Sequence, residues 1–197
     1  MRRVPVFLAL PLFASLALAG GTVQVTEVGK QPVQANFSSG GSLELNLCSG
    51  GVELRGTDDE KIRVSYRSRK DTRQVKVRLT LSGNEGSLEV DNCPHDDFTM
   101  SIEVPRMAHL NVRMFAGQLD IENIQGDKDL ELNFGQLNVE VGKPEDYAHV
   151  KASVTTGEVD GASFDVSKGG FFRSFETTGP GKYNLRAHVG AGQLLLR

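Results

Sequence analysis

The sequence lacks the features that mark several large classes of protein. Beyond residue 19 no apolar run is long enough to cross a membrane, since a spanning helix needs about 20 such residues. The overall charge is mildly acidic, with 22 Lys and Arg against 25 Asp and Glu, which argues against nucleic acid as a partner and against charge-driven binding to anionic lipid. No segment shows the i, i+3, i+4, i+7 apolar spacing of an amphipathic helix, so we expect an almost entirely β protein.

Cofactor and catalytic motifs are missing as well. The four histidines occur singly, and none has a second His or Cys at the spacing of a metal site. The chain contains no P-loop, no Gly-x-Ser-x-Gly motif and no EF-hand loop. The densest polar cluster, CPHDD at 93–97, could hold a divalent cation, but its Pro and Asp-Asp are more typical of a solvated turn. We therefore expect no cofactor and no metal, and we assign no catalytic residue.

A small carbohydrate-active β-helix enzyme is the alternative class. Such an enzyme needs two carboxylates close together on one exposed face. On strands, the acids of this chain fall on the outward phase of the pleat, where solubility alone would place them. A non-enzymatic role is therefore favoured over an enzyme. The acids that such an enzyme could use are Asp58, Asp59, Glu60, Asp96, Asp97, Asp120, Glu122 and Asp160.

The first nineteen residues have the composition of a secretory signal. Arg2 and Arg3 precede an apolar run, VFLALPLFASLALA at 6–19, which ends on the small residues that signal peptidase needs. The sequence thus predicts a cleaved signal peptide over 1–19, an N-terminal leader over 20–35 and a single domain over 36–197. The mature protein would be exported to the periplasm, the outer envelope surface or the medium, with no transmembrane anchor after cleavage.

Only two cysteines are present, Cys48 and Cys93. In an exported chain an even number of cysteines favours a disulfide, which would stabilise the fold by about 3–4 kcal/mol in the chain-entropy model. Two buried, reduced cysteines at strand positions are the alternative.

A glycine-centred motif recurs along the chain, as in FAGQLDI (115–121), NFGQLNV (133–139) and GAGQLLL (190–196). Apolar residues recur five and three positions before the glycine and two positions after it, which is the period of two expected for half-buried strands. The spacing across the glycine is odd, so the backbone must bend there, and glycine tolerates the positive φ that such a bend requires. The residue seven positions before the glycine is apolar in four copies, and it is Lys128 in the fifth. The corner glycines of the five copies are Gly50, Gly117, Gly135, Gly157 and Gly192.

Recurrence at about 20 residues, with two short strands in each copy, is typical of one rung of a β-solenoid. In that fold each rung pairs with the next, and Gln118 and Gln136 would form a short amide ladder along one edge. An antiparallel β-sandwich is the alternative, because it also contains short alternating strands separated by turns.

Five segments together resemble the bacterial putative-adhesin, DUF4097-type β-solenoid family: SLELNLCSGGVELRG (42–56), LNVRMFAGQLDI (110–121), LELNFGQLNV (130–139), VKASVTTGEVDG (150–161) and LRAHVGAGQLLL (185–196). The resemblance covers roughly residues 36–197. It implies a β-solenoid fold and an adhesion-like role at the cell envelope, and it brings no catalytic residue with it.

Two further stretches are candidate contact surfaces. GGFFRSF (169–175) has three phenylalanines that we expect to fill the core or cap the solenoid, and an exposed sticky patch is the alternative. The stretch at 67–78 could dock a polyanion, although an exposed hairpin whose charges prevent edge-to-edge strand pairing is the favoured interpretation. Its basic residues are Arg67, Arg69, Lys70, Arg73, Lys76 and Arg78.

The sequence as a whole predicts an exported, non-catalytic envelope or surface protein that acts as a binding or structural module. An envelope protein or a glycan is the expected partner. A further alternative is an envelope sensor or accessory protein that engages a protein partner through an open end of its sheet.

Overall fold

The computed structural model describes residues 22–197, so the predicted signal peptide lies outside the described residues. The described chain is almost entirely β, as the alternating sequence pattern predicts. Its elements are β1 (Val23–Val28), β2 (Val33–Asn36), β3 (Ser42–Leu47), β4 (Gly50–Thr57), β5 (Lys61–Ser68), β6 (Lys76–Ser82), β7 (Glu85–Asp91), β8 (Phe98–Pro105), β9 (His109–Glu122), β10 (Lys128–Val139), η1 (Pro144–Asp146), β11 (Tyr147–Gly161), η2 (Ala162–Phe164), β12 (Val166–Thr178) and β13 (Tyr183–Leu196).

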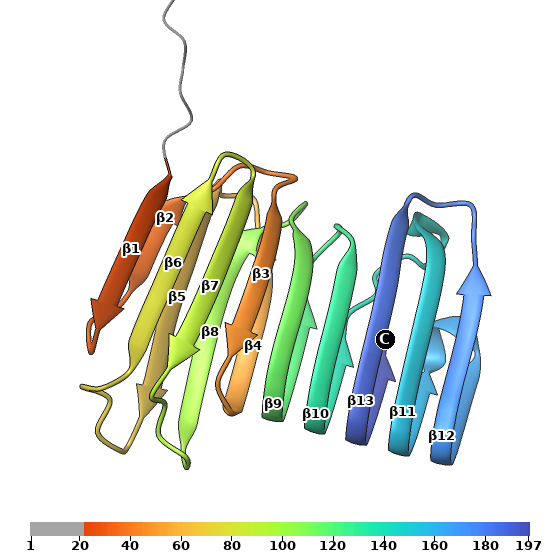
Figure 1. The fold of residues 1–197 in the computed structure, drawn as a ribbon. Coiled ribbons are helices and arrows are strands. Elements are labelled where there is room, and N and C mark those ends of the chain that lie inside the picture. The colour runs from red at the N-terminus through yellow and green to blue at the C-terminus, as the bar shows by residue number, and fades with distance from the viewer. Residues whose placement is uncertain (1–21) are drawn as a thin grey trace, which may run out of the picture.

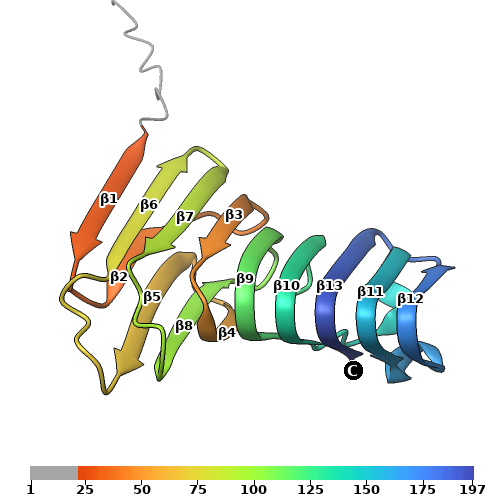
Figure 2. The same ribbon diagram turned by 60° about the horizontal axis from the view of Figure 1, so that its bottom comes forward.

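The strands form one mixed, 13-stranded sheet that folds over into two layers (Figure 1). One layer has the order β1-β6-β7-β3-β9-β10-β13-β11-β12, and the other runs β2-β5-β8-β4 and joins the second half of β9. The long strands from β9 onward belong to both layers, because each bends in the middle and continues on the opposite side, as the curved ribbons of Figure 2 show. Inward side chains from both layers make a single apolar core.

The bends lie at the glycines of the repeated motif. Gly117 pairs with Gly50 and Gly135, and Gly192 pairs with Gly135 and Gly157, so the five glycines stand in one row across the sheet. All five have positive φ, between 126° and 146°. A Cβ atom on Gly135 would lie 1.9 Å from the carbonyl oxygen of Gly117. The row therefore excludes side chains both by backbone conformation and by the closeness of the neighbouring strand.

The order of the strands differs from the sequential stacking expected for the repeats. β10 pairs in parallel with β13 and not with β11, so the last strand of the chain lies between two earlier ones. The reason lies after β11, where the short η2 turn and Asp165, with φ of 56°, send the chain back as β12, antiparallel to β11. β12 occupies one edge of β11, and β13 pairs with the other edge of β11 and with β10.

The segment 20–35, expected as a leader, contains strands of the sheet. β1 pairs antiparallel with β6 in one layer, and β2 pairs antiparallel with β5 in the other. Val33 is buried in the core and Val25 packs against it, and this burial holds the segment on the fold.

Cys48 and Cys93 form a disulfide, which confirms the sequence-based expectation. The bond joins the corner between β3 and β4 to the connection between β7 and β8. It therefore links the two layers of the sheet at the end where the chain bends.

Lys128 is the one buried charged residue of the described chain, with 2% of its surface exposed. It pairs with Leu110 on one side and Leu185 on the other, so it replaces an aliphatic side chain in a column of inward positions. Its Nζ donates hydrogen bonds to the Gly126 carbonyl oxygen at 3.0 Å and to the Tyr147 Oη at 2.9 Å. These two acceptors explain how the core accommodates the position at which the repeat departs from its apolar pattern.

Candidate functional site

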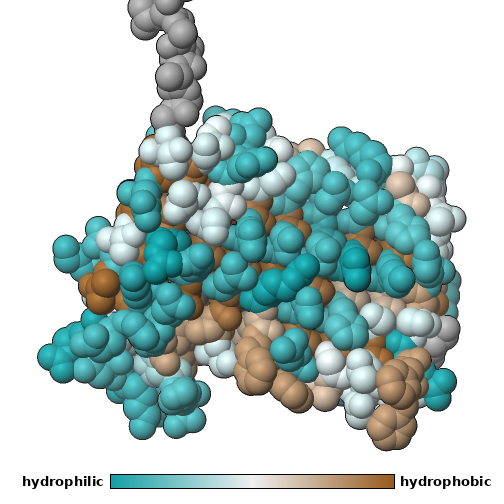
Figure 3. Space-filling view, in the orientation of Figure 1, coloured by the Kyte–Doolittle hydropathy of each residue, from teal (hydrophilic) through white to brown (hydrophobic). Residues whose placement is uncertain are grey.

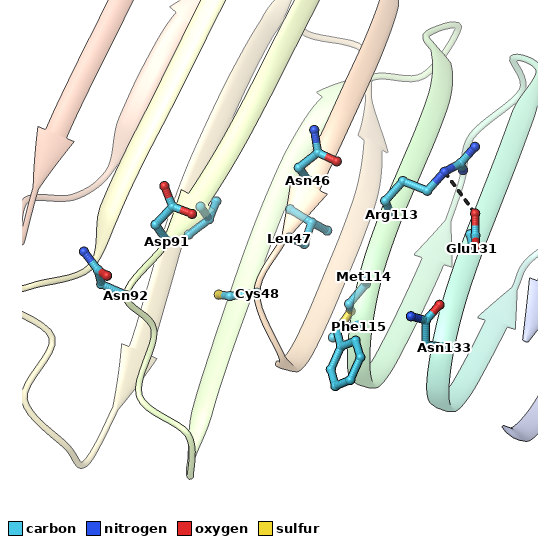
Figure 4. A pocket seen from close by; sticks show the side chains of 11 residues that line it. Asn46, Leu47, Cys48, Asp91, Asn92, Arg113, Met114, Phe115, Glu131 and Asn133 are labelled. Carbon is cyan, nitrogen blue, oxygen red and sulfur yellow. Dashed lines mark ion pairs between the residues drawn. The ribbon is translucent and has the colours of Figure 1, made fainter. Parts of the chain in front are cut away.

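An open pocket of about 460 Å³ lies on the outer face of the first layer, close to the bends of the strands (Figure 4). We call it the corner pocket. It extends from the end of β7, past the β3–β4 corner, to β9 and β10, and the disulfide residue Cys48 is among its lining residues. Its polar lining consists of Asn46, Asp91, Asn92, Arg113, Glu131 and Asn133, and its aromatic lining is Phe115.

Arg113 is the central charged residue of the corner pocket. Its guanidinium lies between two carboxylates of β10, with Nη1 at 3.2 Å from Asp129 Oδ1 and Nε at 3.2 Å from Glu131 Oε2. Figure 4 shows the second of these ion pairs spanning the gap between β9 and β10. Arg113 also donates to the main-chain carbonyl of Asp129, at 3.3 Å. The guanidinium is thus held in one position, and its charge is compensated within the pocket.

Other polar groups of the pocket are not engaged in this way. The side chains of Asp91, Asn92 and Asn133 make no hydrogen bond or ion pair to another of the residues 22–197. An amide offers both donors and acceptors, and a carboxylate offers acceptors. The corner pocket therefore presents a set of free donors and acceptors around the fixed arginine.

Beside these groups lie two exposed phenylalanines. Phe115 on β9 is 61% exposed and Phe134 on β10 is 51% exposed. Their ring centroids lie 5.4 Å apart with an interplanar angle of 67°, which is an edge-to-face arrangement. The two side chains come from positions −2 and −1 of the glycine motif, where the strand turns from one layer to the other. Because of this turn, neither ring can reach the core.

A Ser–His pair lies further along the same face. Ser153 Oγ is 2.9 Å from His188 Nδ1, and His188 is the register neighbour of Glu131. Glu131 is ion-paired with Arg113, and no hydrogen bond or ion pair joins it to His188 in the described part of the chain, so the Ser–His pair lacks the acid that orients the imidazole in a hydrolase triad. The three residues stand on the outward face of adjacent strands, and only Glu131 lines the corner pocket.

The outer face of the second layer carries the glutamines of the motif. Gln118 and Gln136 are register neighbours, but their amides bond along their own strands. Gln118 Nε2 donates to Asp120 Oδ2 at 2.8 Å, and Gln136 Nε2 donates to Asn138 Oδ1 at 2.9 Å. No hydrogen bond joins the two glutamines in the described structure, so the expected amide ladder is replaced by bonds to residues two positions further on.

The candidate acids do not gather into one site. They are spread over the β4–β5 loop, the β7–β8 connection, β9 and β11. Three of them are engaged with arginines: Asp58 with Arg106, Asp97 with Arg69 and Glu122 with Arg55. The described residues contain no group of three His, Cys, Asp or Glu side chains placed to hold a metal ion.

The basic stretch 67–78 is divided between the two layers. Arg67 belongs to β5 in one layer, and Lys76 and Arg78 belong to β6 in the other, with Arg69, Lys70 and Arg73 on the connection between them. Arginines of the stretch are ion-paired with Asp97, Asp71 and Glu89. The hydrogen bond from Arg73 holds the pKa of Asp71 at about 2. Polyanion binding by Arg67, Arg69, Lys70, Arg73, Lys76 and Arg78 stays a prediction.

The phenylalanines of 169–175 have divided roles. Phe175 is buried, whereas Phe171 and Phe172 are 69% and 81% exposed. Core filling was therefore wrong for Phe171 and Phe172, which are exposed on the terminal strand of the sheet order, as the alternative of an exposed patch has it. Gly170 has φ of 118° and pairs with Gly157, so β12 bends in the same row as the other strands and directs Phe171 away from the core.

Sequence reasoning missed the aromatic pair and the corner pocket. Phe115 and Phe134 stand within two positions of a corner glycine, and this placement was a usable signal. In a bent strand such positions face neither the core nor the flat outer surface. The polar lining gave no comparable signal, because its members come from four strands and a loop that are distant in sequence.

Known proteins resemble this chain in fold more than in sequence. No family model matches the sequence, and no curated protein matches it. The chain is similar to a "putative cell adhesion protein" from Clostridium sporogenes ATCC 15579, with a TM-score of 0.50 and 16% identity over 89% of this chain and 99% of that one. It is also similar to a "putative adhesin" from Bacteroides fragilis NCTC 9343, with a TM-score of 0.29 and 9% identity over 90% and 99% of the two chains. The first likeness shows a shared fold, and the second is too distant to add to it. In the described part of the chain no helix has the length and apolarity to span a bilayer.

Proposed function

We propose that the protein is an exported, non-catalytic binding module of a bacterial envelope, with a solenoid-like ladder of bent strands as its scaffold. The observation that carries this proposal is the corner pocket, where unpaired polar side chains and an exposed aromatic pair share one open surface. The flat ladder around it holds side chains in rows at the strand spacing of about 4.8 Å. Such a surface suits an extended ligand that is recognised through many weak contacts.

Three features support export and the adhesion-like role. The sequence begins with a stretch that has the composition of a signal peptide. The disulfide is typical of proteins that fold outside the cytoplasm. The fold is similar to that of a bacterial protein described as a cell adhesion protein. The DUF4097-type resemblance of the sequence points in the same direction.

Binding to envelope material tests the proposal directly. The mature protein, immobilised through a tag, is incubated with envelope extracts and with intact cells of Gram-negative and Gram-positive bacteria. We expect saturable retention of envelope material that survives extensive washing. An absence of retention from every extract would contradict the binding function.

The second candidate is a small hydrolase, and it rests on the Ser153–His188 hydrogen bond with Glu131 beside it. Chromogenic ester and glycoside substrates test it. Turnover that is lost in both Ser153→Ala and His188→Ala, while the fold is retained by circular dichroism, would establish an enzyme in place of a binding module. We expect no turnover, because Glu131 is ion-paired with Arg113 and does not orient the imidazole of His188.

A further inference from the structure

We propose that the corner pocket binds a neutral oligosaccharide, which stacks on Phe115 and Phe134 and runs across the strands toward Phe171. This inference rests on the proposed binding function and names the chemical class of its ligand. It is carried by the chemistry of the aromatic pair, by the free polar groups beside it, and by the path between the exposed aromatic residues.

The aromatic pair supplies the first argument. Burying a phenylalanine side chain is strongly favourable, yet Phe115 and Phe134 are both more than half exposed and stand edge to face. Paired aromatic rings at a surface mark a contact site. The face of an aromatic ring is electronegative, so it attracts the weakly positive C–H groups on one face of a sugar ring.

The polar groups supply the second argument. A sugar ring also presents hydroxyls around its rim, and each hydroxyl donates and accepts. Asn92 and Asn133 offer free amides and Asp91 a free carboxylate, whereas Arg113 and Glu131 already hold each other at 3.2 Å. A volume of about 460 Å³ lies within the range of small-ligand sites, roughly 300–1,000 Å³.

Charge excludes a polyanion from this pocket. Asp91 and Glu131 line it together with a single arginine, and that arginine is compensated by Glu131 and Asp129. Lys76 stands opposite Asp91 in the register of β6 and β7, so three carboxylates face two cations here, and an anionic polymer would meet net negative charge. A neutral ligand meets no such penalty.

The path across the strands supplies the third argument. In register, Phe134 is followed by Ala191 on β13, by Thr156 on β11 and by Phe171 on β12. The two aromatic ends are thus three strand spacings apart, or about 14 Å, with only small side chains between them. Figure 3 shows the corresponding pattern: two brown areas lie along the lower edge, at the bends of the strands, and paler surface separates them. A short, extended oligosaccharide can rest on both ends.

The alternative occupants fit less well. A protein partner usually buries about 800 Å² on each side around an apolar centre, and the apolar residues here form two separate pairs with polar and small residues between them. A second copy of the chain would require the same self-complementary patch on both copies. A second copy would reveal itself by concentration-dependent dimerisation.

The experiment is a titration of the isotope-labelled mature protein, followed by NMR. The probes are four neutral hexasaccharides, those of cellulose, chitin, xylan and β-1,3-glucan, each up to about 10 mM. Polygalacturonate serves as the anionic comparison. We expect at least one neutral hexasaccharide to shift the resonances of Asn133, Phe115 and Phe134, and we expect no such shifts with polygalacturonate.

Variants assign the binding to the site. Phe115→Ala and Phe134→Ala should each weaken the affinity by about tenfold or more, and Phe171→Ala should weaken hexasaccharide binding more than trisaccharide binding. Val28→Ala is the matched control, because Val28 is an exposed apolar residue on β1, at the other end of the sheet. It should leave the affinity unchanged. The aromatic side chains are exposed, so these variants should keep the unfolding transition of the parent protein.

Three results would overturn the inference. The first is the absence of shifts with every neutral hexasaccharide. The second is binding whose shifts lie elsewhere, or that Phe115→Ala and Phe134→Ala leave intact. The third is concentration-dependent dimerisation that these variants abolish, since it would assign the aromatic pair to self-association. The proposed function is judged separately: if the wild-type protein and the Phe115→Ala/Phe134→Ala double variant retain envelope material equally well, the ligand class is wrong and the binding module stands.

Discussion

Lys128 donates a hydrogen bond to the phenolic oxygen of Tyr147 within the apolar core, at 2.9 Å. Burial lowers the pKa of Lys128 from 10.5 to about 8 and raises the pKa of Tyr147 from 10.0 to about 12. The Tyr147 hydroxyl in turn lies 3.3 Å from the carbonyl oxygen of Val141, to which it donates. One chain of hydrogen bonds thus links the start of β10 to the start of β11 across the connection between them.

The first prediction concerns the charge itself. Lys128→Leu should raise the free energy of unfolding at pH 7 by about 1–3 kcal/mol, because leucine matches the register neighbours Leu110 and Leu185 and removes the cost of a buried ammonium group. Chemical denaturation of the two proteins measures the difference. A loss of stability would show that the hydrogen bonds of Lys128 outweigh its desolvation. Leu110→Ala, which should lose about 2–5 kcal/mol, gives the scale of a true core defect.

The second prediction is the dependence of stability on pH. Between pH 8 and 10.5 the unfolded chain still holds the Lys128 proton that the folded protein has released. The unfolded state then binds more protons, so the free energy of unfolding should rise with pH across this window, by about 3 kcal/mol in total. Above pH 10 the folded protein keeps the Tyr147 proton that the unfolded chain loses. The contribution of Tyr147 to the free energy of unfolding should therefore fall with rising pH.

Urea denaturation at a series of pH values measures this profile. The rise should be missing in Lys128→Leu, and the fall above pH 10 should be missing in Tyr147→Phe. A wild-type profile that is flat between pH 8 and 10.5 would contradict the assignment to Lys128.

The third prediction concerns the row of glycines. Gly135→Ala should cost at least about 3 kcal/mol, because its φ is 130° and the new Cβ would lie 1.9 Å from the carbonyl oxygen of Gly117. Gly142→Ala is the matched control: its φ is 72°, but nothing lies within 4 Å of the new Cβ. It should cost only about 1 kcal/mol. Equal losses at the two positions, measured by thermal unfolding, would mean that the closeness of the strands is unimportant.

The fourth prediction concerns the disulfide. The double variant Cys48→Ala/Cys93→Ala should unfold at lower denaturant concentration than the oxidised protein, with a loss of about 3–4 kcal/mol for a sequence separation of 45. Reduction of the wild type should have the same effect and should leave the double variant unchanged. If the variant proves as stable as the oxidised protein, the bond contributes nothing to the fold.

Part of the fold was predictable because its information is local. The alternation that places Leu130, Leu132 and Leu137 on one side indicates which face of the strand packs on the core. The odd spacing of these residues across Gly135 requires a bend. The same logic could have identified Phe115 and Phe134 as exposed, since they stand at the bend itself. Cys48 and Cys93 were predictable as a pair because the chain offers no other cysteines.

The local pattern was thus enough to predict an all-β chain and its row of bends, and the cysteine count favoured the disulfide without deciding it. Three features emerge only in three dimensions: the position of β13 between β10 and β11, the gathering of Asn46, Asp91, Arg113 and Asn133 around one pocket, and the partner of Lys128. The physical reason is that the repeats carry equivalent rows of apolar side chains. The row on β13 fits beside β10, and the corresponding row on β11 would fit there equally well. Which strand takes the free edge depends on where the connections allow the chain to return, and the reversal at Asp165 settles it in three dimensions.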